Sequence, residues 1–170
     1  ASGLVAALIC GAVSMVVGFL LAFFFGKKED KKVVAEPVKA NEETIIAPIE
    51  GTIKPVEESS DAAFASGALG KGVVIIPSDG KVYAPVSGTV TVLFPSLHAI
   101  GITSDSGVEL LIHIGINTVQ LEGKGYTAHI KQGDHVDCGQ LLVEFDMDYI
   151  TKEGYSLETP VLVTNYNDLK

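Results

Sequence analysis

The chain opens with one unbroken apolar segment. Residues 1–26 contain no charged side chain, and residues 3–25 are all apolar or small. As an α-helix this run would be about 34 Å long, which is enough to cross a bilayer. A secretory signal would need a basic start, a shorter apolar core and a cleavage site of small residues, and none of these is present. We therefore expect residues 1–26 to form one transmembrane α-helix.

A charged stretch follows. Residues 27–43 hold five lysines and five acids, with no aromatic side chain that could build a core. Such a composition predicts a flexible linker. Lysines that flank a membrane span stay on the cytoplasmic side, so the rest of the chain is predicted to be cytoplasmic. Because the chain starts without Met, we interpret residues 1–26 as the end of a longer membrane domain.

From residue 44 onward the apolar positions form short runs that are typical of β-strands. Examples are residues 72–77 and 88–94, which are bounded by glycine and proline. No long stretch has helical period, although brief helical turns are expected near residues 62–65 and 146–152. Many short strands separated by turns predict an all-β domain, a sandwich or barrel, over residues 44–170.

An internal repeat supports this prediction. Residues 46–53 are echoed 37 positions later by residues 83–90, and both copies contain the pattern Pro-x-x-Gly. Each copy predicts two strands joined by a turn, in which proline fixes φ at the start and glycine takes a positive φ at the end. A related turn lies within residues 133–142. The sequence therefore predicts a duplicated β motif, which also occurs in biotinyl and lipoyl carriers, so the fold does not determine the function.

The charge distribution limits the class of partner. The linker charges cancel, so residues 44–170 carry the net charge of -9. The chain contains no arginine, which removes the usual bidentate ligand for phosphate or a nucleic-acid backbone. An acidic surface repels polyanions, and we therefore expect no nucleic-acid partner. The same surface suits a basic protein.

One histidine lies on the polar face of a predicted strand. In residues 109–117 the even positions are Leu or Ile, and His113 lies at an odd position. Because side chains alternate between the faces of a strand, His113 is expected to point away from the core. Gly115, on the same face, is expected to leave room beside the imidazole.

A second histidine is expected beside the first. His98 lies in residues 94–102, a predicted strand that pairs with the His113 strand through a turn at residues 104–107. His129 and His135 occur in polar turn contexts and are interpreted as surface residues. The residues alone leave three readings of the His98 and His113 pair open: a phosphoryl or proton-transfer site, two structural histidines, and a zinc pair. Zinc needs three or four ligands, and no cysteine pair or His-x-His accompanies these two.

A family resemblance favours the first reading. Residues 96–102, 107–119 and 122–126 resemble the glucose-family IIA domain of the bacterial sugar phosphotransferase system, and the similarity extends over residues 44–168. The order of span, linker and IIA domain, together with residues 154–165, is similar to the β-glucoside-type permeases arranged IIB, IIC, IIA. The resemblance implies a multi-pass permease in the bacterial cell membrane, with the IIA domain in the cytoplasm.

The resemblance also implies a role for each site residue. His113 would take phosphate from the carrier HPr and so become a phosphohistidine intermediate. It would then pass the phosphate to a IIB cysteine, and this transfer would drive sugar uptake and phosphorylation. His98 would assist, and the Ser96 hydroxyl would help to hold the phosphoryl oxygens. No cofactor is required. By analogy, zinc could be held by His98 and His113 only in a complex with a partner. The IIC domain of the same permease is the further expected partner.

Partner docking would use a ring of apolar and acidic side chains around the histidines. The residues expected there are Asp61, Ala63, Phe64, Phe94, Leu111, Asn117 and Val119. The family usually has Asp where this chain has Asn117, which removes one charge from the contact with HPr. An amide can still accept a hydrogen bond at this position.

Two functions from other classes compete with this assignment. A zinc-dependent endopeptidase of related β fold would need a third metal ligand and a general base. A biotinyl or lipoyl carrier would present a lysine at a hairpin tip, and Lys81 is the nearest candidate. The measured mass distinguishes the three, because it would reveal a labile phosphate, a retained zinc or a lysine-linked cofactor.

Overall fold

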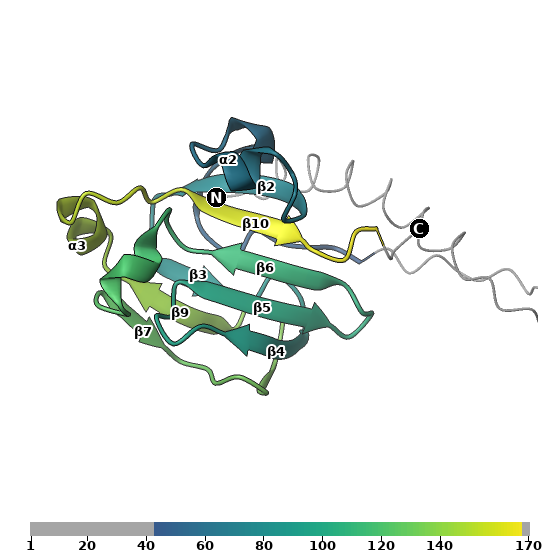
Figure 1. The fold of residues 1–170 in the computed structure, drawn as a ribbon. Coiled ribbons are helices and arrows are strands. Elements are labelled where there is room, and N and C mark those ends of the chain that lie inside the picture. Colours follow the sequence, from purple (N-terminus) through teal and green to yellow (C-terminus); the bar gives the residue numbers. More distant parts are fainter. Residues whose placement is uncertain (1–42, 168–170) are drawn as a thin grey trace, which may run out of the picture.

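The computed structural model describes residues 43–167. Within this range there are ten strands and four short helical segments (Figure 1). The strands are β1 (Gly51–Pro55), β2 (Lys71–Pro77), β3 (Lys81–Tyr83), β4 (Gly88–Leu93), β5 (Ala99–Ser104), β6 (Glu109–His113), β7 (Tyr126–Ala128), β8 (His135–Val136), β9 (Leu141–Phe145) and β10 (Thr159–Val163). The helical segments are η1 (Val56–Glu58), α2 (Ala62–Ala65), η2 (Thr118–Leu121) and α3 (Met147–Lys152).

The N-terminal predictions lie largely outside this range. The transmembrane helix over residues 1–26 and most of the linker over residues 27–43 fall outside the described residues. Within residues 43–167, no helix has the length and apolar character needed to cross a membrane. Glu43, the last residue of the predicted linker, hydrogen-bonds the hydroxyls of Ser104 (3.0 Å) and Ser106 (2.5 Å), so it already belongs to the folded domain.

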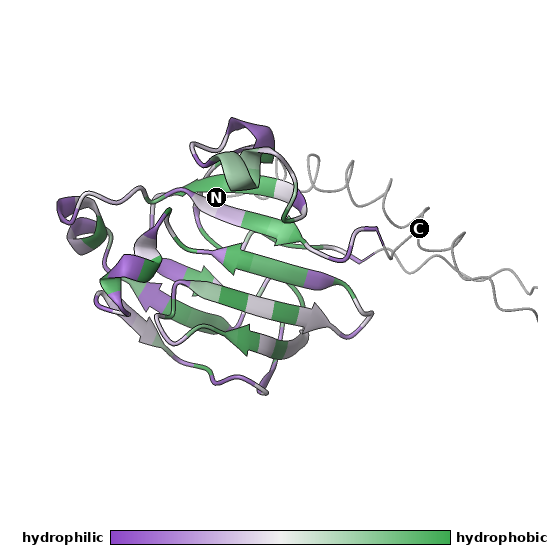
Figure 2. Cartoon of the chain, in the orientation of Figure 1, coloured by the Kyte–Doolittle hydropathy of each residue, from purple (hydrophilic) through white to green (hydrophobic). Residues whose placement is uncertain are grey.

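The strands form two antiparallel sheets, which confirms the all-β prediction for the described residues. The larger sheet has the order β1-β2-β10-β6-β5-β4-β8, and the smaller sheet has the order β3-β9-β7. Apolar side chains from both sheets meet in one core, in which Val82, Ile100, Ile112 and Val143 are fully buried. Figure 2 shows apolar and polar positions alternating along β4 and β5, as expected for strands with one face on a core.

The two copies of the repeat hold each other in place. The Ile46 N–H donates to the Pro85 carbonyl (3.0 Å), and the Tyr83 N–H donates to the Pro48 carbonyl (2.7 Å). β1 follows the first turn and β4 follows the second, but only the second copy is preceded by an assigned strand, β3. The duplicated motif is therefore present, and each turn binds the segment that enters the other.

The repeat glycines have a different role from the predicted one. Neither Gly51 nor Gly88 has a positive φ. A Cβ atom at Gly51 would lie 2.1 Å from the Ile76 carbonyl oxygen, and one at Gly88 would lie 2.3 Å from the Thr103 carbonyl oxygen. The prediction of a left-handed turn residue was wrong, because glycine is needed here for the close approach of the neighbouring strand.

Two short α-helices confirm the predicted helical turns. Asp61 caps α2 by accepting from the Ala63 N–H, and Asp146 caps α3 by accepting from the Tyr149 N–H. A second apolar cluster fixes α2 over the outer face of β6 and β10. Its members are Val56, Phe64, Ile116 and Leu162, with Leu111 packed against them. This cluster brings one end of the α2 segment to the end of β6, where His113 lies.

Candidate active site

His113 is the last residue of β6, on the face that points away from the core. Its neighbours at the even positions are buried, with Ile112 and Ile114 both 0% exposed. His113 itself is half-buried. The alternation predicted from the sequence is confirmed, and it places this imidazole on the outer face of the larger sheet.

The two histidines lie side by side. β5 pairs with β6 so that Ala99 is opposite His113, and the ring centroids of His98 and His113 are 4.8 Å apart at an interplanar angle of 80°. The His98 carbonyl also accepts from the Ile114 N–H at 2.6 Å. His98 lies at the end of the turn between β4 and β5 rather than inside a strand, which corrects the predicted strand over residues 94–102.

A backbone carbonyl fixes the proton of His113. Nδ1 of this ring is 2.7 Å from the Gly115 carbonyl oxygen. Because a carbonyl only accepts, Nδ1 must carry the hydrogen in the neutral ring, and Nε2 then holds a free lone pair. The geometry therefore presents Nε2 as the nucleophilic nitrogen.

Gly115 is required for backbone geometry. Its φ is +76°, and a Cβ atom would lie 2.5 Å from Thr118 Cγ2 and 2.9 Å from the Ser156 carbonyl oxygen. The three atoms nearest to such a Cβ belong to Thr118 and Ser156, so the expectation that this glycine leaves room beside the imidazole stays a prediction. The left-handed conformation directs the Gly115 carbonyl to the ring.

A tight turn delivers His98 together with its hydrogen-bond partner. The Ser96 hydroxyl is 2.6 Å from His98 Nδ1. Leu97, between them, has a φ of 58°, a left-handed conformation that is uncommon for a non-glycine residue, and its N–H donates to the Phe94 carbonyl. Strained residues of this kind cluster at functional sites. The sequence contains no signal for this conformation.

Burial keeps both imidazoles neutral. Desolvation, followed by the charge of His113, lowers the pKa of His98 to about 4. Desolvation also lowers the pKa of His113, although the Gly115 carbonyl and the carboxylate of Asp61 act in the opposite direction. At neutral pH the pair is therefore uncharged, which leaves an unprotonated ring nitrogen on His113.

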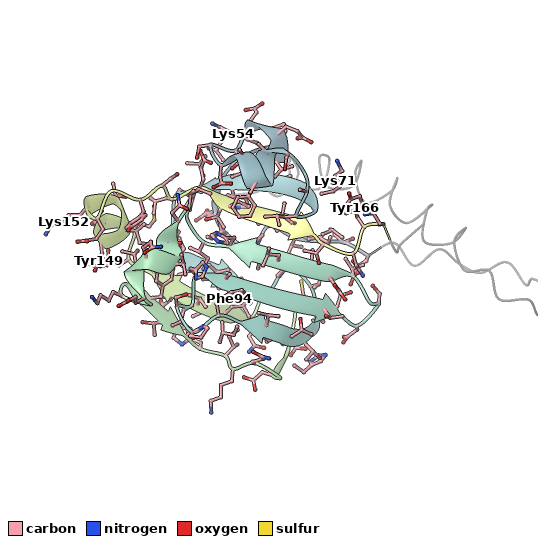
Figure 3. All side chains as sticks on the ribbon, in the orientation of Figure 1. Lys54, Lys71, Phe94, Tyr149, Lys152 and Tyr166 are labelled. Atoms are coloured by element: carbon pink, nitrogen blue, oxygen red, sulfur yellow. The ribbon has the colours of Figure 1, made fainter. Side chains whose placement is uncertain are left out.

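Aromatic rings flank the two histidines. Phe64 contacts His113 with a centroid separation of 5.0 Å, and Phe94 contacts His98 at 5.4 Å. Phe94 follows β4 (Figure 3). It is 43% exposed. Leu111 lies two residues before His113 on the same face and is half-buried. These contacts place three of the predicted docking residues around the histidine pair.

The remaining predicted docking residues lie on the neighbouring elements. Asp61 caps α2 and acts on His113 through its charge. Ala63 is exposed on α2. Asn117 is exposed in a left-handed conformation with a φ of 60°, and Val119, 47% exposed, follows in η2. Ala63, Asn117 and Val119 are therefore exposed residues of α2 and η2 or next to them, and their part in docking stays a prediction.

Sequence reasoning missed one exposed apolar residue near the site. Strict alternation along β4 predicts that Val92 is buried like Val90. A register shift between these two residues forms a β-bulge, and Val92 is 42% exposed. Val92 and Phe94 line a shallow groove beside Gly101 on the outer face of β4, β5 and β6. The groove extends the apolar surface next to His98.

The described residues do not support the two competing sites, a zinc centre and a lysine that carries a cofactor. Within residues 43–167, no cluster of three or more His, Cys, Asp or Glu side chains could hold a metal ion. His129 and His135 are surface residues that pair with Glu144 (2.8 Å) and Asp105 (3.0 Å). Lys81 is the first residue of β3 and lies beside the turn rather than at its tip.

Comparisons with known proteins identify the family of this chain. The family described as phosphoenolpyruvate-dependent sugar phosphotransferase system, EIIA 1, matches residues 43–169. The beta-glucoside-specific EIIBCA component of the phosphotransferase system of Halalkalibacterium halodurans is 55% identical over 124 residues, covering 73% of this chain and 20% of that protein. The glucose-specific EIIA component of the same organism is 46% identical over 140 residues, covering 82% of this chain and 81% of that protein.

A solved structure extends the agreement to the fold. Glucose permease IIA from Mycoplasma capricolum has a TM-score of 0.70 and 38% identity, covering 72% of this chain and 79% of that one. This chain spans about a fifth of the length of the EIIBCA relatives from H. halodurans and Bacillus subtilis. The match covers most of the described fold, including both histidines, and the chain therefore belongs to the EIIA 1 family of the phosphoenolpyruvate-dependent sugar phosphotransferase system.

Proposed function

We propose that His113 carries phosphate, accepting it from the phosphohistidine of HPr and passing it to a cysteine of a IIB domain. The observation that carries this proposal is the 2.7 Å contact between His113 Nδ1 and the Gly115 carbonyl. Because the proton stays on Nδ1, the lone pair of Nε2 is free to attack phosphorus in line. The Nε2–P bond forms as the N–P bond of the donor breaks.

Onward transfer reverses this chemistry at the same nitrogen. The thiolate of the IIB cysteine attacks phosphorus, the S–P bond forms, and the bonding pair returns to Nε2 of His113. A neutral imidazole is a good leaving group, so a phosphohistidine suits a relay. The low pKa of His113 supports this proposal, since a ring protonated on both nitrogens could not accept phosphate.

We assign His98 to hold the phosphoryl oxygens. Ser96 lies at its Nδ1, so when the serine hydroxyl donates there, the proton of the neutral His98 ring is on Nε2. That N–H can donate to the phosphoryl group as it arrives and leaves. Ser96 then acts by orienting His98, which revises its expected role as a direct donor to phosphate.

The exposed rim is proposed as the docking surface for both protein partners. Phe94 and Val119 provide exposed apolar area, and Asp61 provides negative charge beside His113. An apolar centre with acidic groups suits a partner that presents apolar side chains and a basic residue. The net charge of -9 would also attract a basic partner at long range.

We propose that the whole protein is a β-glucoside-type permease of the arrangement IIB, IIC, IIA. Two relatives are named as beta-glucoside-specific EIIBCA components. In this arrangement residues 1–26 end the IIC membrane domain, residues 27–43 are the linker, and residues 44–170 are the IIA domain in the cytoplasm. The relay needs no resident cofactor, and a zinc ion at His98 and His113 would require further ligands from a partner.

Phosphate labelling tests the central assignment. The chain in detergent micelles should take up one phosphate from phosphorylated HPr, and the bond should be labile in acid and stable in alkali. His113→Ala should take up none, whereas His129→Ala should be labelled like the parent chain. Labelling of the His113→Ala variant, or a bond stable in acid, would contradict the proposal.

A further inference from the structure

One carboxylate joins two segments that are far apart in the sequence. Glu158, just before β10, accepts three hydrogen bonds at Oε2: from the Ser60 N–H (2.9 Å), the Ser60 hydroxyl (2.9 Å) and the Ser59 hydroxyl (3.3 Å). The Ser59 oxygen in turn accepts from the Asp61 N–H at 3.3 Å. Three donors from Ser59 and Ser60 converge on this one oxygen, so Glu158 anchors residues 59–61.

The anchored loop carries the acid that acts on His113. Asp61 accepts from the Ala63 N–H at 2.8 Å, which begins α2. The charge of this carboxylate raises the pKa of His113 against the effect of burial. It therefore favours a positively charged ring, the form that His113 takes when phosphate is bonded to Nε2 and the proton stays on Nδ1. Phe64 is held separately, by the apolar cluster under α2. Loss of the anchor would therefore free Asp61 while leaving Phe64 against the imidazole.

The same short segment also contacts a second group that supports His113. The Ser156 carbonyl accepts from the Ile116 N–H at 3.0 Å, and it lies against Gly115, whose carbonyl binds His113 Nδ1. Residues 156–158 thus contact both the loop that carries Asp61 and the backbone at Gly115. In the sequence, this segment was only part of the similarity to β-glucoside-type permeases, and no functional role was predicted for it.

We propose that Glu158 is a positioning residue for phosphate transfer, which holds Asp61 at the distance where its charge acts on His113. This inference rests on the proposed function, since it takes His113 as the phosphate acceptor. Glu158 acts through the serine hydrogen bonds and Asp61, and its own charge is secondary. Glutamine, which keeps an acceptor oxygen, should therefore replace it far better than alanine.

Transfer rates in a matched set of variants test this proposal. With the 170-residue chain in detergent micelles and phosphorylated HPr as donor, Glu158→Ala should slow phosphate uptake by roughly 10- to 100-fold, the range seen for outer-shell groups that orient metal ligands. Glu158→Gln should restore most of the rate. Glu57→Ala removes the same charge two residues before Ser59 and should behave like the parent chain.

A double-mutant cycle tests the route through Asp61. If Glu158 acts by holding this acid, Asp61→Asn should also slow uptake, and the double variant Asp61→Asn/Glu158→Ala should be no slower than Asp61→Asn alone. Additive losses would overturn the proposal. Equal loss in Glu158→Gln and Glu158→Ala would also overturn it, because charge rather than anchoring would then be the cause.

Amide hydrogen exchange separates this inference from the proposed function. In Glu158→Ala the amides of Ser60, Asp61 and Ala63 should exchange faster, while those of β5 and β6 stay protected. Unchanged protection at these three amides would overturn the anchor. If the parent chain takes up no phosphate, the proposed function fails, but the exchange experiment still reports whether Glu158 holds the loop.

Discussion

At the scale of single residues, the two imidazoles are controlled in different ways. His113 Nδ1 meets a carbonyl, which can only accept, so its tautomer is fixed. His98 Nδ1 meets the Ser96 hydroxyl, which can donate or accept. A fixed tautomer suits a nucleophile that must always present the same lone pair. An adjustable one suits a residue that supports a changing charge, and this difference underlies the proposed division of roles.

We expect His98→Gln to affect the two transfer steps unequally. Glutamine keeps a donor near the same place but cannot exchange a proton, so His113 should still be labelled by HPr. Onward transfer to IIB should fall by about 10² to 10³, since loss of one preorganised interaction costs about 2.7 to 4 kcal/mol. A two-step chase of labelled phosphate measures both steps.

The exposed His129→Gln is the matched control and should leave both steps unchanged. Transfer to IIB at the parent rate in His98→Gln would mean that His98 only fills space. Failure to label this variant at all would place its role in acceptance instead.

The second residue-scale prediction concerns pH. The pKa of His98 is about 4 in the folded chain and 6.5 in an exposed histidine. Between these values the unfolded chain binds the additional proton, so the free energy of unfolding should fall as the pH drops from 6.5 toward 4. Urea unfolding at pH 7.5 and about 4.5 should show a smaller fall for His98→Gln than for the parent chain. Equal falls would contradict the pKa assignment.

At the scale of elements, the sequence predicted what depends on local alternation. The burial of Ile112 and the pairing of β5 with β6 follow from period-two patterns and a turn signal, both of which are local. The bulge at Val92, the left-handed Leu97 and the anchor at Glu158 were not predicted. Each of these three features depends on contacts with a distant segment or on how a neighbouring strand ends. Neither cause produces a periodic pattern of apolar residues in the sequence.

The element-scale prediction tests the repeat glycines. In Gly88→Ala the new Cβ would lie 2.3 Å from a backbone oxygen of β5, so β4 must shift. We expect the free energy of unfolding to fall by about 1 to 3 kcal/mol, the usual cost of overpacking. Urea unfolding measures it. Gly101→Ala is the matched control, because its Cβ would lie 3.1 Å from Val92 Cβ, a much milder contact than 2.3 Å to a backbone oxygen.

A smaller loss is therefore expected for Gly101→Ala than for Gly88→Ala. If Gly88→Ala unfolds at the same urea concentration as the parent chain, close strand approach is not the reason for glycine at this turn.

At the scale of the whole molecule, charge and shape act together. The described residues place the histidine pair at one end of the β5–β6 hairpin, with an exposed apolar rim and an acid beside it. The net charge of -9 extends attraction for a basic partner beyond that rim. Long-range attraction raises association rates more than it raises final affinity, and it weakens with salt.

The prediction at this scale is Asn117→Asp. Asn117 is exposed and left-handed, a conformation that Asp also tolerates, so the fold should be unchanged. The added carboxylate should raise the rate of phosphate uptake from HPr at low salt, and the gain should fade as ionic strength rises. Gln132→Glu adds the same charge in an exposed turn outside the proposed docking surface and should give a smaller gain. Equal gains would remove Asn117 from the docking surface.

The crossed bonds between the two repeat turns have a consequence for how the domain can form. Exchange of the two copies maps the Ile46–Pro85 bond onto the Tyr83–Pro48 bond, as in the isologous contact of a two-fold dimer. A single copy of the repeat would have a turn without its partner, and two separate copies could satisfy both bonds only by associating. The chain thus contains a small symmetric contact between the two copies of the repeat, and neither copy can make these bonds alone.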